Sequence, residues 1–200
     1  MKTQEAISLS DDLINWTDKS IDGIDLPSET RFRLAGACLD VALEHHKAII
    51  LLIKHRLYGS AFAMVRPLFE SYVRGVWLHR CASDSDINRF TADKLNYSFG
   101  KLIQDVETLP GFDVGTLSKV KSSAWSAMNS YTHSGLLQVT RRNTASSIEP
   151  NYTEDEILEI IQNVNTFSLF IVMGTANLAG NEPLMKAVLE KVEILNKGSN

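Results

Sequence analysis

The sequence contains little cysteine, and this shortage excludes two classes of small stabilised domain. Two cysteines occur in 200 residues. Cys38 and Cys81 stand alone in apolar stretches, and no Cys-x-x-Cys pair is present, which argues against a disulfide framework and a zinc site. We expect both to be buried free thiols of a protein in a reducing compartment.

Strand patterns and the short motifs of common enzyme classes are also missing. Alternation of apolar and polar residues is nearly absent, and no Asn-Gly or Asp-Gly hairpin turn separates such runs. No zinc-protease, P-loop or dinucleotide motif occurs, and the Gly-x-Ser sequences lack a nucleophile-elbow context. His45 and His46 are neighbours, which face different directions on a helix. We therefore expect no metal site and no cofactor.

Positive charge and long apolar runs are scarce as well. The net charge is −4 and the pI about 5.7, whereas dedicated nucleic-acid binders are usually basic overall. A local basic patch stays compatible with these values. The most apolar segments, 48–53 and 167–173, are shorter than the ~20 residues of a membrane span. The N-terminus has no apolar signal core, so we expect a cytoplasmic protein without membrane contact.

Helical periodicity dominates the chain and predicts an all-α fold. Short connections between long helices indicate an antiparallel bundle of six to seven helices in a single domain over 1–200. Its parts are an N-terminal helix and link (1–27), a bundle core (28–180) and a C-terminal helix and tail (181–200). Helices are expected at about 3–19, 29–57, 61–81, from the 83–86 turn to 106, 115–132, from a capping box at 153–156 to 178, and up to 196. Pro67 predicts a kink or restart in the third of these.

The third predicted helix carries a stripe of charge. Arg66, Glu70 and Arg74, with Trp77, fall within about a quarter of its circumference. One interpretation is a face with ion pairs four residues apart, each contributing ~0.2–0.5 kcal/mol. The other is a site wall on which Glu70 orients two guanidiniums toward an anion.

The end of the fifth predicted helix is the second candidate. His133 lies just before Gly135, where the negative end of the helix dipole would favour a protonated imidazole. Asn129 shares its face with other small polar residues, which allows another helix to approach closely. A structural capping role for His133 is the alternative interpretation.

Two segments together resemble a known group of proteins. They are Ala-Met-Val-Arg-Pro-Leu-Phe-Glu at 63–70 and Tyr-Thr-His-Ser-Gly at 131–135. They resemble uncharacterised bacterial helical proteins that are similar to HEPN domains, the small helical bundles common in toxin–antitoxin and phage-defence systems. The resemblance covers roughly 29–142.

This resemblance implies two different sites. HEPN ribonucleases pair two protomers and use an arginine and a histidine separated by four to six residues. Arg74 and His79 match that spacing, although Gly75 stands where a polar residue is usual. The residues that match the uncharacterised group are instead Arg66, Glu70 and His133, and we favour this set because both of its motifs match.

Our leading hypothesis is a homodimeric, HEPN-like bundle that binds RNA or a nucleotide and cleaves a phosphodiester without a metal. Arg66 and Arg74 would bind phosphate, Glu70 would orient these two arginines, and His133 would act as general acid or base. The residues expected to contact the substrate are Arg74, Tyr131, Gln138 and Arg141. The alternative is a non-catalytic interaction module, with an antitoxin-like protein partner and a structural Arg-Glu-Arg network. A small-molecule-binding bundle is a third class.

Overall fold

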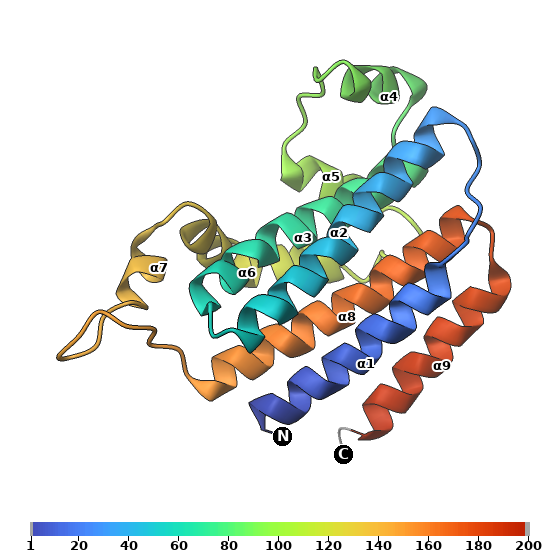
Figure 1. Cartoon of the computed structure of the whole chain (residues 1–200). Coiled ribbons are helices and arrows are strands. Elements are labelled where there is room, and N and C mark those ends of the chain that lie inside the picture. The colour runs from blue at the N-terminus through green and yellow to red at the C-terminus, as the bar shows by residue number, and fades with distance from the viewer. Residues whose placement is uncertain (1, 199–200) are drawn as a thin grey trace.

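Helices make up almost all of the regular structure (Figure 1). The computed structural model describes the backbone of residues 2–198 and the side chains of residues 2–195. Over this part of the chain there are nine helices and no strands, which confirms the all-α prediction and exceeds the expected number. The helices are α1 (Thr3–Ile21), α2 (Thr30–Lys54), α3 (Tyr58–Arg80), α4 (Asp84–Thr91), α5 (Phe99–Val106), α6 (Thr116–Thr132), α7 (Leu136–Thr140), α8 (Glu154–Leu178) and α9 (Glu182–Gly198).

The extra helices arise at two places. The single helix predicted after the 83–86 turn is wrong, because α4 and α5 are separate helices joined by 92–98. Asp93 adopts a left-handed backbone with φ 54°, which ends α4, and the Ser98 hydroxyl caps α5. The short α7 lies in a stretch for which no helix was predicted. The expected capping box at Thr153 forms, and Ser83 closes a second one at the start of α4.

Pro67 does not restart the third helix. The residue lies within α3, which runs from Tyr58 to Arg80 as one element. The helix therefore presents Arg66 and the residues on both sides of Pro67 on one continuous scaffold.

The long helices pack side by side, and two of them organise the rest (Figure 1). α2 and α3 form the most extensive interface. α8 lies against α1, α2, α3 and α9, while α5 and α6 pack on α3. α3 thus joins the bundle of long helices to the shorter helices α5 and α6.

α8 is the central core helix of this arrangement. It is long and apolar enough to cross a membrane by length and composition, a property that the short stretch 167–173 did not reveal. Nearly half of its most apolar window is buried inside the fold. Packing against four other helices accounts for the apolar side chains that face them.

Both cysteines are free, as expected, but they are half-buried rather than fully buried. Burial raises the pKa of the Cys38 thiol, and burial together with nearby Asp105 raises that of Cys81. Cys38 of α2 and Cys81, which directly follows α3, pack against the hydrophobic core without being enclosed by it.

Candidate functional site

The charge stripe of α3 begins with an ion pair one helical turn long. The Nε atom of Arg66 donates to Oε1 of Glu70 at 2.9 Å, as the spacing of four residues allows. The two side chains are 19% and 26% exposed. This pair is therefore neither a solvated surface pair nor a fully buried one.

α6 brings three further side chains to the same guanidinium. Trp125, Asn129 and His133 are spaced by four residues, so they share one face of the helix. Nη1 of Arg66 donates to Oδ1 of Asn129 and lies 2.8 Å from Nε2 of His133. Its guanidinium carbon is 4.6 Å from the centre of the Trp125 ring. These four residues and Glu70 form what we call the Arg66 cluster.

The contact between Arg66 and His133 has a defined direction. Arginine has no acceptor atom, so its Nη1–H is the donor and Nε2 of His133 is the acceptor.

Gly135 turns the chain away two residues after His133. A Cβ at this position would lie 2.6 Å from Oγ and 3.0 Å from Cα of Ser130, so a larger residue would force the turn open. The Gly135 amide donates to the Ser130 carbonyl at 2.7 Å, and the Leu137 amide to the Ser130 hydroxyl at 3.0 Å. This turn ends α6 and leaves His133 exposed at the helix terminus.

Trp125 connects the Arg66 cluster to the hydrophobic core. Its ring stacks on Phe99 of α5 with centroids 5.0 Å apart, and Phe99 meets Phe69 of α3 edge-on at 5.2 Å. Lys121 adds a second cation, 5.7 Å from the centre of the same Trp125 ring. The Arg66 cluster and the adjacent Lys121 therefore bring together two cations, one carboxylate, an imidazole and an aromatic face.

Three residues predicted to contact the substrate form a different group. Tyr131 is buried against Phe62 and Tyr152. The Gln138 amide donates to the Gly59 carbonyl at 3.2 Å, and Arg141 pairs with Glu156. Tyr131 lies two residues from His133, which is about 200° around the helix, so it points away from the Arg66 cluster.

Packing dominates this second group, and two of its polar atoms are buried without a hydrogen-bond partner among the described residues. Burial raises the pKa of Tyr131, against the effect of Arg141, and burial raises the pKa of Tyr152 to about 12. The Tyr152 hydroxyl and the Nε of Arg141 are buried and lack a hydrogen-bond partner among the described residues. Both tyrosines therefore stay neutral over the physiological range.

Arg74 and His79 do not join either group. Arg74 makes no hydrogen bond or ion pair within residues 2–195, and its charge only partly offsets the rise that burial causes in the pKa of the Cys38 thiol. The His79 ring packs against Phe32 at 5.5 Å. Trp77, which the stripe seemed to include, is buried in the core and donates to Asp105 at 3.0 Å. No hydrogen bond joins Arg74 to His79 among the described residues.

The sequence reasoning missed Trp125 as a member of the cluster, although its spacing from His133 was visible. Eight residues separate the two, which is close to two helical turns and places them on one face. Among the described residues, no group of three His, Cys, Asp or Glu side chains is placed to hold a metal ion.

Residues 39–195 match a family of unknown function, DUF6988, and this chain belongs to that family. The match includes α3 and α6, and therefore the whole Arg66 cluster. No curated protein and no solved structure matches the chain. The family assignment carries no activity and no link to HEPN domains.

Proposed function

We propose that this DUF6988 protein binds RNA at the Arg66 cluster and cleaves it without a metal ion. The observation that supports this most is the 2.8 Å contact between Arg66 and His133, which come from different helices. It places a titratable imidazole beside a permanent cation. Because His133 is exposed, a substrate can reach both groups.

The chemistry would be attack of a ribose 2′-hydroxyl on the adjacent phosphorus. The 2′-oxygen forms a bond to phosphorus, and the bond to the 5′-oxygen breaks, which leaves a 2′,3′-cyclic phosphate and a 5′-hydroxyl. Nε2 of His133 takes the proton of the 2′-hydroxyl, and water or a group of a second protomer protonates the leaving oxygen.

Arg66 has one donor group left for the phosphate. Its Nε and Nη1 atoms are bonded within the protein, whereas Nη2 makes no hydrogen bond among the described residues. Rotation of the guanidinium toward a bound phosphate would release Nε2 of His133 for proton transfer and stabilise the developing negative charge.

Trp125 and Lys121 suit a single-stranded nucleic acid. A half-exposed indole offers a face on which a base can stack, and stacking of this kind contributes ~1–3 kcal/mol per base. Lys121 lies beside the same ring and can meet a neighbouring phosphate. The HEPN resemblance agrees with this substrate, a homodimer and a cytoplasmic toxin–antitoxin or defence role.

The test is cleavage of labelled single-stranded RNA by the purified protein in EDTA. We expect wild type to cleave and His133→Gln to be slower by roughly 100-fold or more, the typical contribution of general acid–base catalysis. Arg66→Lys should also lose activity, since lysine cannot keep both bonds and reach the phosphate. His55→Gln, at an exposed position on another helix end, is the matched control. Equal cleavage by all variants, or by none, would reject the catalytic proposal.

A non-catalytic interaction module, with an antitoxin-like partner, is the second candidate. The observation that favours it is that Arg66 uses most of its donors inside the protein, between α3 and α6. In that case the cluster sets how the two helices pack, and it recognises no ligand.

Glu70→Ala measures this structural contribution. We expect a loss of about 1–2 kcal/mol in the free energy of unfolding, less than the ~3–5 kcal/mol of a fully buried pair, because both side chains keep some exposure. Glu159→Ala, at an exposed site on α8, should change little. If Glu70→Ala melts like wild type, the cluster does not hold the helices together.

If a saturating oligonucleotide leaves the melting temperature of wild type unchanged, the interaction module is favoured over RNA binding.

A further inference from the structure

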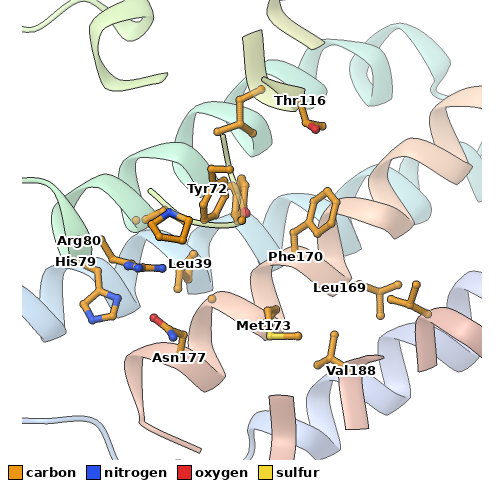
Figure 2. Close-up of a pocket in the computed structure, with 18 of the residues that line it drawn as sticks. Leu39, Tyr72, His79, Arg80, Thr116, Leu169, Phe170, Met173, Asn177 and Val188 are labelled. Carbon is orange, nitrogen blue, oxygen red and sulfur yellow. The ribbon is translucent and has the colours of Figure 1, made fainter. Parts of the chain in front are cut away.

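A cavity of about 550 Å³ opens between α3, α8 and α9 (Figure 2). Residues 110–112, which follow α5, and the first residues of α6 complete its wall. The volume lies within the range of small-molecule sites. No residue of the Arg66 cluster lines this cavity, so it is separate from the RNA site proposed above.

Most of the cavity wall is apolar. Figure 2 shows Phe170, Leu169 and Met173 of α8 facing it, with Val188 of α9 beside them. Phe170 is 40% exposed and Leu189, also in the wall, is 58% exposed, although both are large apolar residues. Covering such side chains contributes about 25 cal/mol per Å² of apolar surface removed from water.

Two glycines of the cavity wall let its helices pack closely on α2. Gly75 of α3 and Gly174 of α8 both lie against Leu39 of α2. A Cβ on Gly75 would be 2.9 Å from Cδ2 of Leu39 and 3.2 Å from the Ala35 carbonyl, which is too close without movement. The absence of side chains at these positions lets α3 and α8 approach α2 closely, so that Leu39 of α2 forms part of the cavity wall.

One end of the cavity is polar and cationic. His79 and Arg80 from the last turn of α3 lie near Asn177 from the last turn of α8 (Figure 2). Arg80 and Asn177 are exposed, and their side chains make no hydrogen bond or ion pair within residues 2–195. No aspartate or glutamate lines the cavity.

The Arg80 guanidinium is not bonded to the backbone carbonyls at the end of α3. Arg31 of α2 already donates to the carbonyls of Leu78 and Ala82, and it pairs with Asp84 at 2.8 Å. Burial, together with Arg80 and Arg31, lowers the pKa of His79. The imidazole is therefore neutral at pH 7 and can donate one hydrogen bond beside the free guanidinium of Arg80.

We propose that the cavity binds an amphipathic monocarboxylate, with an unbranched apolar chain of about fatty-acid type. The carboxylate lies on Arg80, whose planar fork can hold it with two hydrogen bonds, and on Asn177. The chain lies along Phe170 and Met173. A single cation at one end of an apolar cavity complements this shape and charge.

The experiment is isothermal titration calorimetry of the full-length protein with dodecanoate, below its critical micelle concentration. We expect saturable binding of one ligand per chain. Dodecyltrimethylammonium, with the same tail and a cationic head, should bind at least about 10-fold more weakly. Arg80→Ala should weaken dodecanoate about 10-fold, which is the loss of ~1.4 kcal/mol, and remove the preference between head groups. Phe170→Ala should weaken both ligands.

Two control variants make the outcome specific to this cavity. Arg33→Ala removes the same charge from an exposed position on α2, and Leu51→Ala removes an exposed leucine outside the cavity. Both should bind dodecanoate like wild type. No saturable binding, equal binding of the two head groups, or an equal loss in Arg33→Ala would overturn the proposal. A dimer in sedimentation equilibrium that Phe170→Ala dissociates and dodecanoate does not would also overturn it, because a second copy would then occupy the cavity.

Discussion

Trp77→Ala is expected to lower the free energy of unfolding by about 3–5 kcal/mol, the usual loss for a fully buried large aromatic residue. The side chain is 1% exposed and among the largest fully buried ones in the fold. Its indole nitrogen donates to Oδ2 of Asp105, and its ring meets Tyr97 edge-on at 5.6 Å. The change therefore leaves a cavity and deprives a carboxylate of its buried donor.

Urea unfolding at 25 °C measures this loss, and two variants separate its causes. Trp77→Phe keeps much of the packing but removes the N–H donor, so we expect it to retain more stability than alanine. Trp16→Ala, at a half-buried position on α1, should be less damaging. A loss below about 1 kcal/mol in Trp77→Ala would contradict the packing described here.

The same variant connects stability with the proposed site. Trp77 bonds to Asp105 of α5, and Phe99 of the same helix stacks on Trp125 in the Arg66 cluster. Loosening α5 should therefore also disturb the face that is proposed to stack a base.

Acidification is expected to destabilise the fold through His46, by up to about 1.4 kcal/mol for each pH unit below ~6.5. His46 is completely buried, and burial lowers its pKa despite the hydrogen bond to Asn165. In the unfolded chain this histidine binds a proton near pH 6.5, whereas in the folded chain it binds one only at lower pH. The contribution of His46 is fully present above this pH and is lost as the pH falls toward the lower pKa of the folded state.

A buried polar chain explains why this imidazole stays neutral. Nε2 of His46 lies 2.9 Å from Oδ1 of Asn165, and the Asn165 amide donates to Ser10, whose hydroxyl donates to the Ala6 carbonyl. Since Oδ1 accepts, Nε2 carries the proton. Nδ1 is then an unprotonated nitrogen, buried without a partner among the described residues. A second proton there would place an unpaired charge in the core between α1, α2 and α8.

Chemical denaturation from pH 7.5 down to pH 5 tests this expectation. His46→Gln should show a shallower decline in stability than wild type, since one titrating group has been removed. His55→Gln, at an exposed position, should follow the wild-type curve. Identical slopes for wild type and His46→Gln would show that another group carries the pH dependence.

Interactions between residues close together in the sequence determined much of the secondary structure of this protein. Helical periodicity, the two capping boxes and the ion pair of Arg66 with Glu70 all depend on residues within about one turn of each other, so they can be predicted from the sequence. The prediction failed where local signals conflict, as between α4 and α5, where a left-handed Asp93 interrupts the periodic pattern.

Contacts between helices were decided only by the tertiary structure. His133 lies 67 residues from Arg66, and no local rule indicates whether such residues meet. The packing of α6 on α3 brought these two together with Trp125, while the helical phase of Tyr131 turned it to a different group. The apolar cavity likewise needs side chains from α3, α8 and α9 at once. Periodicity says which face of a helix is apolar, whereas packing geometry decides what that face meets and where space is left.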